Sequence, residues 1–67
     1  MHLVLQYHNG IIGYNLPQDL EQAMIEAVDR CNDVSTSADI INSSNASVVA
    51  EIRPSVHDAF RYVAKQV

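Results

Sequence analysis

The chain has few of the residues that small proteins use as covalent staples or catalytic loops: its 67 residues include one cysteine, two glycines, two prolines and no tryptophan. One cysteine cannot form an intramolecular disulfide, which excludes a small secreted scaffold held by disulfides. No apolar run approaches the ~18 residues of a membrane-spanning helix. The N-terminus also lacks the basic region and apolar core of a signal peptide. We therefore expect a soluble, cytoplasmic protein without membrane association.

Positive charge is also scarce, because four lysine and arginine residues stand against eight acidic residues, for a net charge of −4. Residues 1–49 carry a net charge of −5, whereas residues 50–67 carry +1. Nucleic-acid-binding proteins draw affinity from clustered Lys and Arg side chains that neutralise phosphates. The charge distribution therefore disfavours direct nucleic-acid binding.

The composition that remains is typical of a folded protein, with 48% hydrophobic and 18% charged residues. The length predicts a single domain over residues 1–67. At this size, apolar burial barely exceeds the entropy cost of ordering the chain. Since neither a disulfide nor a metal motif is evident, association with another chain is the stabilising device that is left.

The strongest local signal is Asn9-Gly10 between two apolar runs, a pair typical of a two-residue type I′ turn. It predicts a β-hairpin with strands over about residues 2–8 and 11–15. Directly opposed residues share a face of a sheet. The predicted core face therefore collects aliphatic and tyrosine side chains: Leu3, Leu5, Tyr7, Ile12, Tyr14 and Leu16.

A helix is predicted over about residues 16–32, with Asn15 as its N-cap and Pro17 in its first turn. The position of Cys31 predicts a small buried hydrophobe, because a reactive thiol needs surroundings that lower its pKa. This helix is expected to cover the core face of the hairpin. Its apolar stripe has helical spacing and consists of Leu20, Ala23, Met24, Ala27, Val28 and Cys31.

The next segment has two interpretations. Thr36 followed by Asp39 resembles a capping box and predicts a short helix over about residues 37–43. Alternatively, one helix continues to Ile52. We favour a break followed by a third strand over residues 47–53, because that stretch is short, rich in β-branched residues and precedes a proline.

A C-terminal helix is predicted over about residues 55–66, where Ser55 and Asp58 match a capping box. The predicted fold class is α+β, with two helices packed on one face of a small antiparallel sheet. The apolar stripe of this last helix consists of Val56, Phe60, Val63 and Val67.

No arrangement of side chains indicates catalysis or a cofactor. The chain has no phosphate-binding glycine loop, no Gly-x-Ser-x-Gly elbow and no His-Glu-x-x-His motif. His2 and His8 lie ~20 Å apart on one predicted strand, too far to share a metal ion. A chain this small also has little room for a ligand pocket of ~300 Å³. We predict no catalytic, cofactor-binding or metal site, and no small-molecule ligand.

We therefore predict a non-catalytic protein-interaction or regulatory module, which binds a protein partner or forms a homodimer through a sheet edge. Val4 and Ile11 are apolar residues outside the predicted core and are the expected edge residues. An alternative is a nucleic-acid-associated regulator that uses the C-terminal helix. An enzyme of unknown reaction ranks third. The interaction residues proposed on that helix are Arg61, Tyr62 and Lys65.

Overall fold

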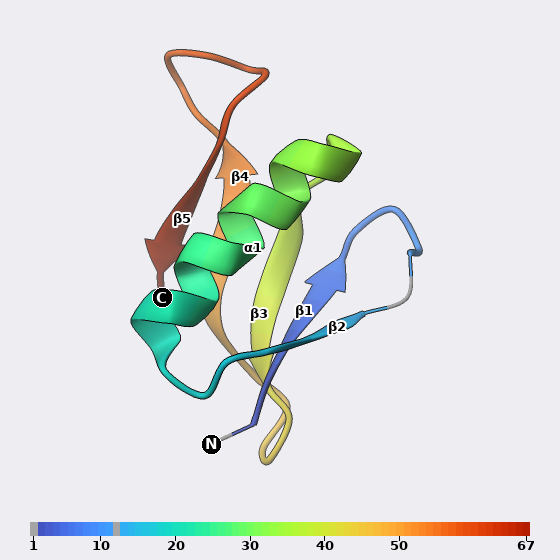
Figure 1. The fold of residues 1–67 in the computed structure, drawn as a ribbon, viewed down its shortest axis with the longest axis vertical. Coiled ribbons are helices and arrows are strands. Elements are labelled where there is room, and N and C mark those ends of the chain that lie inside the picture. Colours follow the sequence, from blue (N-terminus) through green and yellow to red (C-terminus); the bar gives the residue numbers. More distant parts are fainter. Residues whose placement is uncertain (1, 12) are drawn as a thin grey trace.

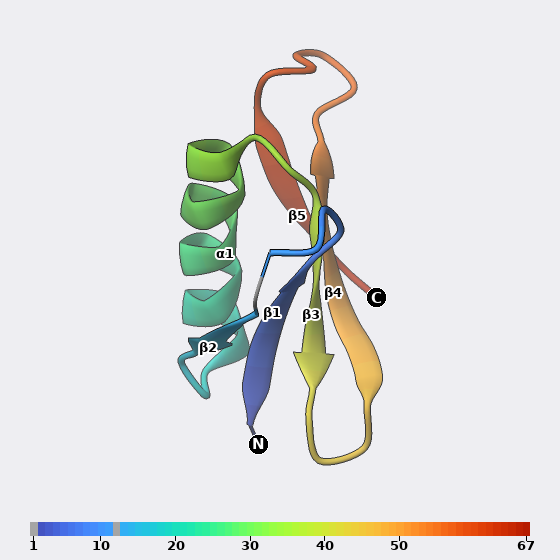
Figure 2. The same cartoon turned by 90° about the vertical axis from the view of Figure 1, so that its right-hand side faces the viewer.

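The computed structural model describes residues 2–11 and 13–67, and this part of the chain forms one helix and five strands (Figure 1). The strands make one antiparallel sheet of order β2-β1-β3-β4-β5. Figure 2 shows α1 against one face of this sheet, and no other described element covers the opposite face. In chain order the elements are β1 (Leu3–Tyr7), β2 (Tyr14–Leu16), α1 (Leu20–Val34), β3 (Ala38–Asn42), β4 (Ser47–Pro54) and β5 (Tyr62–Gln66).

The N-terminal hairpin keeps three of the predicted strand pairs, in which Leu3, Val4 and Leu5 lie opposite Leu16, Asn15 and Tyr14. The predicted two-residue turn is wrong, because β1 ends at Tyr7 and β2 begins only at Tyr14. A type I′ turn needs positive φ at both central residues. Of Asn9 and Gly10, only Gly10 has one, at 86°. The predicted core position Ile12 lies outside the described residues.

β1 is a central strand, which corrects the expectation that Val4 lies at a free sheet edge. Its second side pairs along its whole length with β3, from Leu3 opposite Asn42 to Tyr7 opposite Ala38. The ladder extends beyond the strand, because the His8 backbone N–H donates to the Ser37 carbonyl at 2.9 Å. Pairing on both sides explains why β1 is longer than β2.

α1 begins four residues later than predicted. Asn15 belongs to β2, where it pairs with Val4 of β1, and it therefore cannot cap the helix. Asp19 is the N-cap, and its carboxylate accepts from the Glu21 backbone N–H at 3.0 Å. The helix ends at Val34 and is capped by Ser35, which adopts the left-handed conformation with φ of 53°. Ala23, Ala27 and Cys31 are the buried residues of α1.

The predicted short helix over residues 37–43 is wrong, since residues 38–42 form β3. Ala38 and Ile40 are buried beneath α1, and Asp39 and Ile41 alternate with them. β3 and β4 are joined by a tight turn in which the Asn45 N–H donates to the Asn42 carbonyl at 3.3 Å. The Ser/Asn-rich segment is therefore a hairpin turn and not the end of a helix.

The predicted C-terminal helix over residues 55–66 is also wrong. Residues 55–61 connect β4 to β5, and residues 62–66 are β5. The Ser55 hydroxyl accepts from the His57 N–H at 3.2 Å and the Asp58 carboxylate from the Phe60 N–H at 3.0 Å. These local bonds fix turns instead of a helix start. Val56 and Phe60 are 94% and 93% exposed, so they do not form a core-facing stripe.

The core lies between α1 and the covered face of the sheet. Cys31 is completely buried, and burial raises the pKa of its thiol to about 11. The prediction that Cys31 is a small buried hydrophobe is therefore confirmed. In the described part of the chain, no helix has the length and apolar character that crossing a membrane requires. The core residues are Leu3, Leu5, Leu16, Ala23, Ala27, Cys31, Ala38, Ile40, Ala50 and Ile52.

Candidate functional site

β2 and β5 are the two outer strands of the sheet, and they differ as exposed edges. β2 has three residues and is followed directly by Pro17, which cannot donate a backbone hydrogen bond. β5 has five residues, Tyr62 to Gln66, and among the described elements only β4 pairs with it. Short strands and prolines are common protections of sheet edges. β5 is therefore the more accessible edge.

The register of β4 and β5 determines which backbone groups of β5 point away from the sheet. Ser55 donates to the Arg61 carbonyl, and Val67 donates to the Val49 carbonyl, so odd-numbered residues direct their backbone groups towards β4. In an antiparallel ladder the intervening residues point the other way. The backbone groups of Tyr62, Ala64 and Gln66 therefore face the outer edge.

One of these outward groups is already occupied. The Tyr62 N–H donates to the side-chain oxygen of Asn32 on α1, at 3.0 Å. This bond places the last turn of α1 beside the first residue of β5, so the helix and the strand run in opposite directions (Figure 1). The outward N–H groups of Ala64 and Gln66 have no such helix partner among the described hydrogen bonds.

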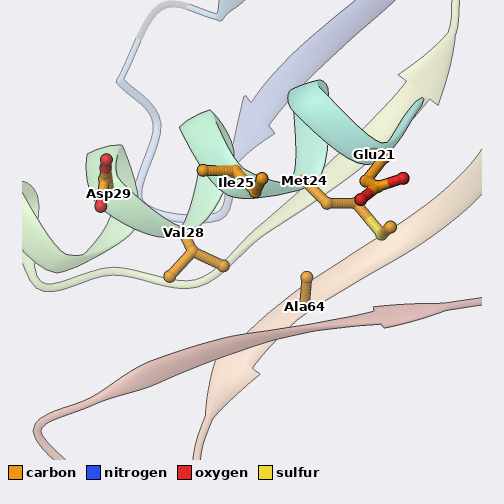
Figure 3. Close-up of a pocket in the computed structure, with 6 residues that line it drawn as sticks. All are labelled: Glu21, Met24, Ile25, Val28, Asp29 and Ala64. Atoms are coloured by element: carbon orange, nitrogen blue, oxygen red, sulfur yellow. The ribbon is translucent and has the colours of Figure 1, made fainter. Parts of the chain in front are cut away.

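A groove of about 350 Å³ lies between α1 and β5 (Figure 3). Met24, Ile25 and Val28 form its helical wall, and the small side chain of Ala64 points towards the helix from β5. Ile25 is 62% exposed although it is a large aliphatic residue. The groove therefore offers an apolar surface directly beside the free backbone groups of Ala64. The volume of the groove also exceeds the ~300 Å³ for which so short a chain was expected to have little room.

The groove has an acidic rim, formed by Glu21 and Asp29 on the exposed side of α1. Among the residues that the structure describes, no basic residue lines the groove. Arg30 lies on the other flank of α1, where its guanidinium carbon is 3.3 Å from the centre of the Tyr14 ring and its Nε is 3.6 Å from Glu26. Arg30 is therefore paired away from the groove and does not neutralise the charge of Glu21 and Asp29.

The open face of the sheet carries a network of charged side chains. Asp39 of β3 accepts from Arg53 of β4 at 2.8 Å, and its other oxygen lies 3.0 Å from His8 Nε2. Burial alone would raise the pKa of the Asp39 carboxyl, but the hydrogen bonds with His8 and Arg53 outweigh burial and lower it. Glu51 lies opposite Asp39, and Arg53 also approaches it at 3.6 Å.

His8 also contacts Ser37, whose hydroxyl lies 3.1 Å from His8 Nδ1. Ser37, His8 and Asp39 thus have the composition of a serine–histidine–aspartate relay. Hydrolysis by such a relay also needs oxyanion donors and a site that holds the substrate. The groove lies on the helix side of the sheet and is lined by none of these residues. We interpret them as a structural link between β1, β3 and β4.

The structure separates the interaction residues that the sequence predicted. Val4 is half-buried in the central strand β1, and Ile11 is 45% exposed in the connection that follows it. Tyr62 and Lys65 lie on opposite faces of β5, because three positions separate them. The two residues therefore cannot form one surface with Arg61, and the helix proposed to carry all three is absent from the described chain. Sequence reasoning missed Ala64, Glu21 and Asp29.

No protein-family model, curated protein or solved structure matches this chain. Any functional proposal for it is therefore drawn from the geometry described above.

Proposed function

We propose that the chain is a small protein-interaction module that binds an extended segment of a partner by adding it as a strand to β5. The observation that carries the proposal is the position of the outward backbone groups of Ala64 and Gln66 beside an apolar groove. In strand addition, main-chain hydrogen bonds supply affinity and pockets for alternate side chains supply specificity. Here β5 offers the main-chain hydrogen-bonding groups, and the groove offers a pocket for a side chain.

The mode of binding follows from the register of β5. A residue placed opposite Ala64 exchanges backbone hydrogen bonds with it, and opposed residues share a face of the sheet. The side chain of that residue therefore lies on the helix side, in the groove between Ala64 and Val28. The next side chain along the segment points to the open face. The groove therefore selects every second side chain.

A partner chain fits this edge better than a second copy of the protein. Only the even-numbered residues of β5 direct their backbone groups outwards. Two copies joined through β5 would therefore pair these residues with each other, namely Tyr62, Ala64 and Gln66. A two-fold axis near Ala64 would also bring Glu21 of one copy towards Asp29 of the other. Like charges at short range destabilise association.

Isotope-edited NMR titration with the acetylated and amidated peptide Thr-Gln-Thr-Leu-Thr-Gln-Thr tests the proposal. We expect the largest shift changes at Ala64, Gln66, Ile25 and Val28. Ala64→Pro removes an outward N–H that β4 does not use, so this variant should stay folded and bind at least ten-fold more weakly. Gln66→Pro, nearer the end of the chain, provides a second test with less risk to folding.

Ile11→Lys is the control, because Ile11 is exposed and lies in the connection between β1 and β2, at the opposite edge of the sheet from β5. It should bind the peptide as the wild type does. Shift changes centred on β2 or on the open face would contradict the proposal, as would unchanged binding by both proline variants. Sedimentation of the free protein at micromolar concentration tests whether β5 binds a second copy of this chain instead. A wild-type dimer that Ala64→Pro dissociates would show that β5 binds a second copy and not a different protein.

A further inference from the structure

The acidic rim of the groove identifies the chemistry of the partner segment. Resting on the proposed strand addition at β5, we infer that the preferred segment has the pattern basic–x–apolar–x–basic, with the apolar residue opposite Ala64. Glu21 and Asp29 are both exposed, lie at the two ends of the groove (Figure 3) and have no basic residue beside them among its described lining residues. An incoming cation would therefore meet uncompensated negative charge.

The spacing of the rim matches the spacing of side chains on an added strand. Glu21 and Asp29 are eight positions apart on α1, a rise of ~12 Å. Residues two positions before and after the central one are four positions apart on a strand, or ~13 Å, and share its face. Because α1 and β5 run in opposite directions, one flanking residue lies near Asp29, beside Tyr62, and the other near Glu21, beside Gln66.

The centre of the groove suits an aliphatic side chain. Its lining between the two carboxylates consists of Met24, Ile25, Val28 and Ala64, all apolar. Ala64 has only a methyl side chain, which is directed towards the helix (Figure 3), so it leaves room above β5 for the side chain of a bound segment. A charged side chain at the central position would be buried there without a partner, which is costly.

A second copy cannot supply this pattern, although its own β5 contains Arg61, Val63 and Lys65 at the right intervals. These odd-numbered residues direct their backbone groups to β4 and their side chains away from the helix. They therefore cannot lie opposite Ala64 in a hydrogen-bonded pair. The basic residues have to come from another protein.

Three acetylated and amidated peptides test the inference: Thr-Lys-Thr-Leu-Thr-Lys-Thr, its glutamine counterpart and its glutamate counterpart. At low ionic strength we expect the lysine peptide to bind about ten-fold tighter than the glutamate peptide, with the glutamine peptide between them. The preference should shrink as salt screens these exposed charges.

The double variant Glu21→Gln with Asp29→Asn should reduce the preference to about two-fold or less while the glutamine peptide binds as before. Glu26→Gln is the matched control, because it removes one carboxylate from the other flank of α1. It should keep the full preference. Circular dichroism should show the same helix content in every variant.

The two proposals fail in different ways. Equal binding of the three peptides, still weakened at least ten-fold by Ala64→Pro, would overturn the basic pattern and leave strand addition intact. Tighter binding of the glutamate peptide would also overturn it. If none of the peptides binds at millimolar concentration, both strand addition at β5 and the basic pattern are wrong.

Discussion

At the scale of single residues, the two glycines perform different tasks in the connection between β1 and β2. A Cβ added at Gly13 would lie 2.9 Å from the Leu5 carbonyl oxygen and 3.3 Å from Val4 Cγ1, so β2 approaches β1 closely there. A Cβ added at Gly10 would meet no atom within 4 Å, but φ at Gly10 is 86°. Gly13 is required for space, whereas Gly10 is required for its backbone conformation.

This difference predicts two distinct costs of substitution. Gly13→Ala should lower the free energy of unfolding by about 1–3 kcal/mol, the usual cost of forcing atoms into a packed site. Gly10→Ala should lower it by about 1 kcal/mol through backbone strain alone. Urea unfolding of the two variants measures both. A Gly13→Ala protein as stable as the wild type would show that β2 does not approach β1 as described.

At the scale of secondary-structure elements, sequence patterns located the elements that local chemistry determines. Leu5 opposite Tyr14 follows from a hairpin register centred on Asn9-Gly10, which holds although the connection is longer than two residues, and the central turns of α1 follow from a stripe at helical spacing. The strand predicted over residues 47–53 is confirmed as β4, which extends to Pro54. In these segments, one periodicity dominates.

The patterns failed where one spacing served two structures. Val56 and Phe60 recur at helical spacing, but both are exposed in a hairpin connection. The hydroxyl and carboxylate of Ser55 and Asp58 can bond nearby N–H groups in a turn as well as at a helix start. β3 was missed because it pairs along its whole length with β1, a partner more than 30 positions earlier in the chain that no local window contains. The groove could not be predicted, because one of its walls is β5 and the sequence pattern predicted a helix there.

The charged network on the open face should make the linkage of β1, β3 and β4 sensitive to acid. Because the pKa of Asp39 is lower in the folded protein, its carboxylate stabilises the fold at pH values above its pKa in the unfolded chain, near 3.8. That contribution to stability is lost as the pH falls through the lower pKa that Asp39 has in the folded protein. Asp39→Asn should therefore destabilise the protein by about 1 kcal/mol at pH 7, the usual net value of such hydrogen bonds.

Urea unfolding at neutral pH and at about pH 2–3, below the usual carboxyl range, checks this prediction. The difference between wild type and Asp39→Asn should shrink at the lower pH, because the unfolded chain then binds a proton at Asp39 more readily than the folded protein does. Asp33→Asn removes the same charge from an exposed position in the last turn of α1 and should change stability little. A difference for Asp39→Asn that stays constant with pH would contradict the assigned role of its charge.

At the scale of the whole molecule, one helix covers one face of a five-stranded sheet within residues 2–11 and 13–67. α1 lies against the sheet so that its flanks differ. Arg30 and Glu26 pair on the side of Tyr14, while Glu21 and Asp29 line the groove beside β5. The apolar groove, its acidic rim and the outward backbone groups of Ala64 therefore occur together at one edge, and this coincidence is the basis of the proposed function.

Amide hydrogen exchange with and without the lysine peptide tests that proposal most directly. In the free protein, the amides of Val63 and Lys65 should be protected by β4, and those of Ala64 and Gln66 should exchange rapidly. With the peptide at saturation, exchange at Ala64 and Gln66 should slow at least ten-fold, because both become donors to an added strand. Unchanged exchange at Ala64 while the peptide is bound would contradict strand addition at β5.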